Sequence, residues 1–94
     1  MTYFEPVRCL YTAWFRDRCA SPEDEDFEWP ACFVVVSSTE DGAKTWGDHL
    51  AHSFSQRRGV VEFLGSAIEP APDNCSDLVV VKDGCEVSDA EIGW

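Results

Sequence analysis

The sequence predicts a single α+β domain, residues 1–94, in which one amphipathic helix packs on one face of a small mixed or antiparallel sheet. A chain of 94 residues can form one hydrophobic core but not two. Hydrophobic residues make up 45% of the chain, which argues against disorder. A helix-periodic stretch over residues 39–58 lies between pairs of strand-like runs, and this predicts the order β-β-α-β-β.

The first strand is expected over residues 2–19, which are rich in aromatic and β-branched residues. Successive side chains of a strand point to opposite faces of the sheet. The even-numbered face carries Phe4, Leu10 and Trp14 among arginines, which is too apolar for a face that meets only water. The odd-numbered face is nevertheless the natural core face, and it is expected to form the core through Tyr3, Val7, Cys9, Tyr11, Ala13 and Phe15.

The second strand is expected over residues 31–37, after an acidic loop at 20–28. Its Cys-Phe-Val-Val-Val run shows no alternation, which is typical of a strand with both faces buried. The loop is long enough for a hairpin, so the first two strands are predicted to pair antiparallel. Cys9 and Cys32 lie within apolar runs, where cysteine usually behaves as a small buried hydrophobe.

The helix over residues 39–58 has the clearest signals. Ser38 with Asp41, or Ser37 with Glu40, gives an N-cap followed three residues later by an acidic residue. The apolar positions recur with the spacing of one helix face. This stripe consists of Ala43, Trp46, Gly47, Leu50, Ala51 and Phe54.

Two more strands are predicted after the helix, over residues 60–68 and 78–82. The first of them alternates only weakly between apolar and polar residues. The tail at 85–94 is mostly polar but ends in Ile92 and Trp94, which could pack against the rest of the domain.

The net charge of −11, from 18 acidic and 7 basic residues, disfavours binding to nucleic acid or to an anionic membrane surface. It suits a basic protein partner. The beginning of the sequence does not resemble a signal peptide, and no apolar run approaches the roughly 18 residues that a membrane span requires. The five cysteines are odd in number and form no CxxC pair. We therefore expect a cytoplasmic protein with free thiols.

Two groups of side chains resemble metal ligands. His49 and His52 stand three residues apart with Asp48 beside them, but helical geometry turns both imidazoles away from the apolar stripe. We expect a solvated helix face on which Asp48 and His52 form an ordinary surface pair. The acidic run at 23–28 lacks the ligand spacing of an EF-hand loop. It is expected to be a solvated loop or a contact for a basic partner.

No catalytic motif is present: there is no GxSxG sequence and no Gly-rich phosphate-binding loop. We therefore assign no catalytic, cofactor-binding or metal-ligating residue. One alternative is a ligand-binding or enzymatic domain with a cleft between sheet, tail and partner subunit. Another is an acidic inhibitor or mimic that acts on a basic partner.

A single helix is roughly 10–12 Å wide and can cover only one face of the sheet, although the strands are apolar on both. The tail, a second copy of the chain or a different protein could cover the other face. The sequence favours a homodimer, and hence a non-enzymatic protein-interaction module. The residues expected at its interface are Arg8, Leu10, Trp14, Arg16, Ile92 and Trp94.

Overall fold

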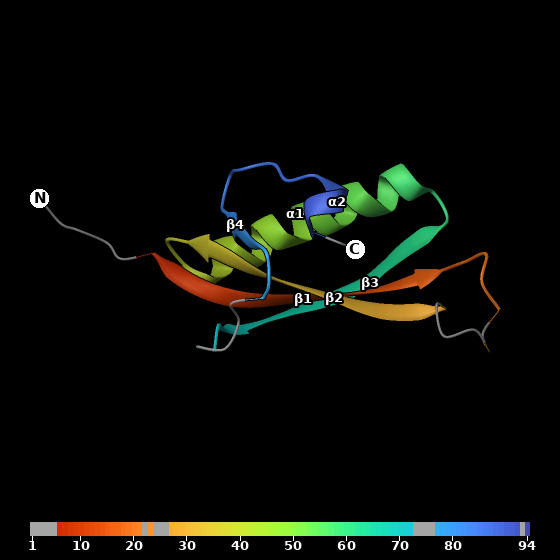
Figure 1. Ribbon diagram of the computed structural model, residues 1–94, viewed down its shortest axis with the longest axis horizontal. Coiled ribbons are helices and arrows are strands. Elements are labelled where there is room, and N and C mark those ends of the chain that lie inside the picture. Colours follow the sequence, from red (N-terminus) through yellow and green to blue (C-terminus); the bar gives the residue numbers. More distant parts are fainter. Residues whose placement is uncertain (1–5, 22, 24–26, 73–76, 93) are drawn as a thin grey trace, which may run out of the picture.

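The computed structural model describes residues 6–21, 23, 27–72, 77–92 and 94. It confirms the predicted α+β class and the order β-β-α-β-β, and it adds one short helix in the tail (Figure 1). No helix in the described ranges is long and apolar enough to cross a membrane. In chain order the elements are β1 (Val7–Asp17), β2 (Glu28–Ser37), α1 (Glu40–Arg58), β3 (Val61–Pro70), β4 (Val80–Lys82) and α2 (Asp89–Ile92).

The four strands form one mixed sheet in the order β3-β1-β2-β4. β1 is antiparallel to both of its neighbours, β2 and β3, so the predicted antiparallel pairing of the first two strands is confirmed. β4 joins the other edge of β2 in the parallel direction. β1 thus pairs along most of its length with both β2 and β3 and carries the middle of both faces.

Several strand boundaries differ from the prediction. β1 ends at Asp17 rather than at residue 19, and β4 begins at Val80 rather than at residue 78. Pairing with β1 sets two further boundaries. β2 begins at Glu28, three residues early, since its register with β1 continues as far as Arg16. β3 extends to Pro70, which lies opposite Cys9. β1 is described from Val7 onward, and the predicted strand residues 2–5 lie outside the described residues.

A bulge explains the weak alternation of β3. Trp14 pairs with Gly65 and Phe15 with Phe63, so Leu64 is an extra residue opposite β1. An inserted residue shifts which side chains face the core. Before the bulge the odd-numbered Val61 and Phe63 point to the core side, whereas after it the even-numbered positions do.

The odd-numbered face of β1 forms the core, as predicted. It packs against the apolar stripe of α1, of which Leu50 and Phe54 are buried. Cys9 is buried as expected, but the prediction that Cys32 is buried was wrong: Cys32 is exposed on the opposite face. The buried core side chains of β1 are Cys9, Tyr11, Ala13 and Phe15.

Helix α1 begins at Glu40, one residue later than predicted, and its N-cap is not one of the two serines expected from the sequence. Thr39 is the N-cap, and its hydroxyl accepts a hydrogen bond of 2.9 Å from the backbone N–H of Gly42. Ser37 is the last residue of β2, and its hydroxyl instead donates to the carboxylate of Asp83. The chain therefore turns between strand and helix at Ser38, and Thr39 takes the capping role.

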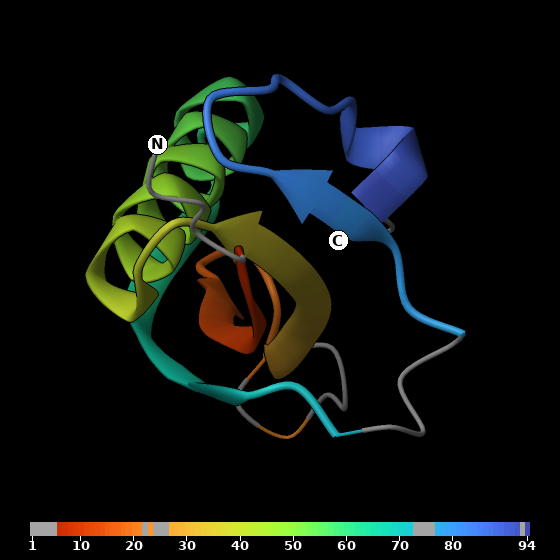
Figure 2. The ribbon, with the colours of Figure 1, turned by 90° about the vertical axis from the view of Figure 1, so that its left-hand side faces the viewer.

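The C-terminal tail packs on the same face of the sheet as α1 (Figure 2). The indole N–H of Trp46 donates to the carbonyl of Cys85 at 3.2 Å, and the guanidinium of Arg57 pairs with Asp89. The ring of Trp94 stacks on Phe54 with centroids 5.0 Å apart. The described residues of the tail thus add to the cover that α1 gives to this face of the sheet.

Candidate interaction surface

The face of the sheet opposite α1 carries the even-numbered side chains of β1 and their register partners on the other strands. We call this surface the open face. In the described part of the chain no helix packs on it. Along β1 it presents, in order, Arg8, Leu10, Thr12, Trp14 and Arg16.

The centre of the open face is apolar. Trp14 is 42% exposed, and Val80 on the edge strand β4 is 50% exposed. Leu10, Val34 and Val80 lie in one row across three strands, and the middle residue, Val34, is fully buried. The apolar strip of the open face consists of this row together with Trp14, which lies on the other side of Thr12 along β1. Trp14 and Val80 remain in contact with water.

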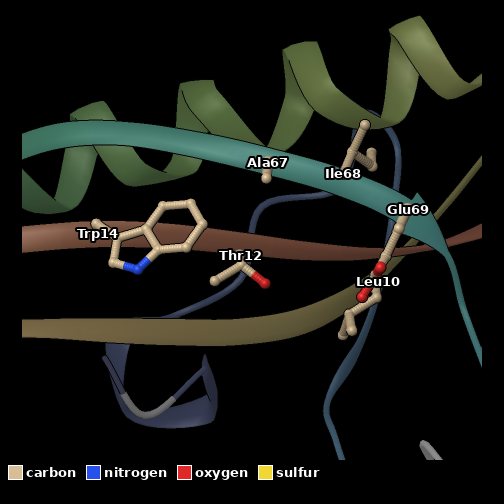
Figure 3. A pocket seen from close by; sticks show the side chains of 6 residues that line it. All are labelled: Leu10, Thr12, Trp14, Ala67, Ile68 and Glu69. Carbon is tan, nitrogen blue, oxygen red and sulfur yellow. The ribbon is translucent and has the colours of Figure 1, made fainter.

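A shallow hollow of about 280 Å³ lies on this face between β1 and β3. Figure 3 shows the side chains of Leu10, Thr12 and Trp14 in a row along β1, with Glu69 reaching from β3 toward Leu10. Apart from the Glu69 carboxylate, the Thr12 hydroxyl and the indole N–H of Trp14, the side chains that line it are apolar. The hollow suits a bulky apolar side chain better than a polar small molecule.

One end of the open face is a cluster of three charges. The guanidinium of Arg16 bonds to the carboxylate of Glu28 on β2 at 2.8 Å, and it lies 3.7 Å from Glu62 on β3. One positive group between two negative ones leaves this end with a net negative charge. All three side chains are 40–50% exposed, so the cluster is accessible to a partner.

The other end of the open face is basic along β1, β2 and β4. Arg8 on β1 lies in the same row as Val36 on β2 and Lys82 on β4. Both basic residues are exposed. Glu69 on β3 belongs to the neighbouring row, opposite Leu10. The two ends of the face therefore differ in the sign of their charge.

The structure places four of the six predicted interface residues together and separates the other two. Arg8, Leu10, Trp14 and Arg16 share the open face, whereas Ile92 and Trp94 pack against the core on the face that α1 covers. The sequence missed the contributions of β4 and β3 to this surface. Their strand order could not be deduced from an alternating pattern alone.

The two histidines of α1 point to different neighbours. His49 stacks on Trp46 with centroids 4.7 Å apart, and its Nε2 lies 3.2 Å from a carboxylate oxygen of Glu86. His52 makes an edge contact with Phe63 of β3. Among the described residues no three His, Cys, Asp or Glu side chains converge as metal ligands.

Asp48 has a role that the sequence did not reveal. Its predicted surface pair with His52 is wrong, because its carboxylate accepts hydrogen bonds from Tyr11 at 2.7 Å, Ser66 at 2.5 Å and Lys44 at 3.0 Å. Burial opposes ionisation of Asp48, but these three donors outweigh it and hold the pKa of the carboxyl below its usual range. Burial, together with the bond to Asp48, raises the pKa of Tyr11. The cluster fastens α1 to the sheet.

The remaining candidate groups lie apart from the open face or outside the described residues. Glu23 is exposed, and positions 24–26 of the acidic run lie outside the described residues. Of the cysteines, Cys19 and Cys85 are free and exposed. Among the described cysteines, Cys32 is the one on the open face, where its Sγ lies 3.4 Å from the hydroxyl of Thr12.

Comparison of the chain with protein-family models, with curated proteins and with solved structures finds no match to any of them. The assignment of a function therefore depends on the geometry of the chain itself.

Proposed function

We propose that this chain is a cytoplasmic protein-interaction module without an enzymatic activity of its own, and that it forms a homodimer through the open face. The observation that carries the proposal is the exposure of Trp14 in the apolar strip of the open face. Large exposed apolar patches are rare on monomers and mark sites of protein contact. Tryptophan and arginine are the residues most enriched at energetically important interface positions.

The composition of the open face supports a protein partner rather than nucleic acid. Within the described residues, the face carries three basic residues, Arg8, Arg16 and Lys82, and three acidic ones, which are Glu28, Glu62 and Glu69. Their charges cancel, whereas the whole chain has a net charge of −11. A phosphate backbone requires a surplus of positive charge. A neutral face with an apolar centre and charged ends has the composition of a protein interface.

The test is the mass of the chain in solution, measured by light scattering for the wild type and for Trp14→Ala. We expect a dimer for the wild type and at least a tenfold weaker dimer for the variant, because truncation of a central tryptophan typically costs about 2 kcal/mol or more of binding energy. Val60→Ala is the matched control, since Val60 is also exposed (41%) but precedes β3. A monomeric wild type would disprove the proposal.

The hollow beside Trp14 favours one second candidate, a binding site for a small apolar ligand. In the described part of the chain, the groups with displaced pKa values all lie on the α1 side of the sheet; they are Cys9, Tyr11, Asp48 and Arg57. None of them lines the hollow, so this candidate is a binder and not a catalyst. An apolar fluorescent probe that binds the wild type but not Ala67→Trp, which fills the hollow, would support it.

A further inference from the structure

We infer that two copies of the chain pack open face to open face with their β1 strands antiparallel, about a two-fold axis that crosses β1 at Thr12. This inference rests on the proposed dimer and adds its geometry. The positions of the charged residues, of Cys32 and of the bulky apolar residues on the open face identify the partner as a second copy of the chain.

The first argument is the symmetry of β1 itself. Along the open face its side chains run Arg8, Leu10, Thr12, Trp14, Arg16, which is charged, apolar, polar, apolar, charged about the central Thr12. A closed two-fold dimer requires a surface that is complementary to itself. An antiparallel arrangement centred on Thr12 places Trp14 of one copy over Leu10 of the other. Leu10 lines the hollow, so each indole has a cavity to fill.

The second argument is the opposite charge of the two ends. In the antiparallel arrangement, Glu28 on β2 of one copy falls between Arg8 on β1 and Lys82 on β4 of the other, since all these positions lie four residues from the axis. Each dimer contains this contact twice. The antiparallel arrangement also sets Arg16 over the partner's Arg8, but Glu28, which pairs with Arg16, then lies beside both guanidinium groups. The remaining face-to-face arrangement, with the β1 strands parallel, places Glu28 over the partner's Glu62 and sets Arg8 and Arg16 each over the same residue of the partner. Contacts between like charges oppose that alternative.

The third argument is the position of Cys32. It lies in the same row as Thr12, and therefore on the axis, so the antiparallel arrangement brings the two Cys32 thiols face to face. The parallel arrangement instead places Cys32 over the partner's Ala67, which is the register partner of Thr12 on β3. The thiol is exposed and so reports directly on the arrangement.

The electrostatic experiment uses two charge-reversed chains, Glu28→Lys and Arg8→Glu/Lys82→Glu, with dissociation constants measured by sedimentation equilibrium. Each variant alone should dimerise about tenfold or more weakly than wild type. Mixed together they should form a heterodimer, because both ends of the mixed pair are again complementary. Glu40→Lys makes the same charge change on α1 and should leave the dimer unchanged. Full dimerisation of both variants alone would overturn the arrangement.

The thiol experiment uses a bismaleimide short enough to bridge the roughly 10 Å between packed sheets. We expect a cross-linked pair of Cys32 peptides by mass spectrometry, which disappears in Cys32→Ser. A dimer that yields no Cys32–Cys32 pair overturns the antiparallel arrangement while the proposed dimer stands. A wild-type monomer overturns both, and the mass measurement separates the two results.

Discussion

Gly47 determines how closely α1 approaches the sheet. A Cβ atom at this position would lie 2.4 Å from the ring of Tyr11, a distance that real side chains do not tolerate. Tyr11 is fully buried, so its ring cannot move aside without displacing core neighbours. The lack of a side chain at Gly47 is therefore what allows the Tyr11 hydroxyl to reach Asp48, one residue further along the helix.

Gly47→Ala should destabilise the protein by about 1–3 kcal/mol, the usual effect of overpacking a core. At an exposed helical site the same change would stabilise the helix by roughly 1 kcal/mol, so the sign of the effect is diagnostic. Urea unfolding measures it. Thr45→Ala, at an exposed position of α1, is the control and should change stability by no more than about 0.5 kcal/mol. A Gly47→Ala variant that is more stable than the wild type would show that α1 does not approach Tyr11 this closely.

Asp48 makes the stability of the fold depend on pH, and the lowered pKa of its carboxyl determines whether stability rises or falls with pH. An acid whose pKa is lower in the folded than in the unfolded chain stabilises the fold above its unfolded pKa. That stabilisation is lost as the pH falls through the folded pKa. Asp48→Asn should therefore be about 1–2 kcal/mol less stable at pH 7, and the difference from wild type should vanish in acid.

Unfolding in urea at several pH values measures this effect. Tyr11→Phe removes one of the three donors to Asp48 and should show an intermediate pH dependence. Equal pH dependence for the wild type and Asp48→Asn would show that the carboxylate is not held by these hydrogen bonds.

At the scale of elements, the tail acts as a second cover beside α1. The ring of Trp94 contacts Phe54 by stacking, and it meets Phe15 and Phe33 edge-on at 5.2 and 5.4 Å. Trp94→Ala should cost about 3–5 kcal/mol of stability. The buried indole N–H of Trp94 finds no hydrogen-bond partner in the described part of the chain. Trp94→Phe, which keeps an aromatic ring and removes that donor, should cost much less.

Thermal or urea unfolding of the two Trp94 variants, followed by the fluorescence of the remaining tryptophans, distinguishes them. Equal unfolding midpoints for Trp94→Ala and the wild type would mean that the tail does not pack on the core. A Trp94→Phe variant as unstable as Trp94→Ala would show that the indole contributes more than its aromatic contacts.

The elements themselves were predictable to the extent that their signals are local. The span of α1 follows from its apolar stripe, from Glu40 and Asp41 in its first turn and from Gly59 after its last residue. All these signals lie within about twenty residues of sequence. The cap was placed wrongly because Ser37, Ser38 and Thr39 are equivalent by composition, and only the pairing of β2 shows that Ser37 still belongs to a strand. Helix α2 was missed because four residues carry no periodic signal.

Long-range contacts could not be predicted because they depend on register. Asp48 has three partners from three separate segments, and no pattern within α1 identifies Tyr11 or Ser66. Cys32 and its neighbours Phe33 and Val34 are all apolar, so the sequence did not reveal which of them faces the helix. The sequence predicted the open face because the strands carry more apolar side chains than one helix can cover. The charged residues at its two ends could be placed only once the order of the strands was known.

At the scale of the whole molecule, the open face is neutral, so the net charge of −11 belongs to the rest of the chain. Two approaching copies therefore repel each other at long range, while their contact surfaces are complementary. The Debye length falls from about 30 Å at 10 mM salt to about 8 Å at 150 mM. The shortest dimension of the chain is 21 Å, well beyond 8 Å, so at the higher salt concentration the repulsion between charges that lie outside the contact surface is largely screened.

Raising the salt concentration over this range should consequently strengthen the proposed dimer several-fold, since screening removes long-range repulsion before it weakens ion pairs in direct contact. Sedimentation equilibrium at constant pH measures the dissociation constant. Trp14→Ala should show the same salt trend from a weaker starting affinity, because the substitution leaves the charge unchanged. A dimer that weakens as salt rises would mean that attraction between the charged ends, rather than the apolar strip, dominates the association of the two copies.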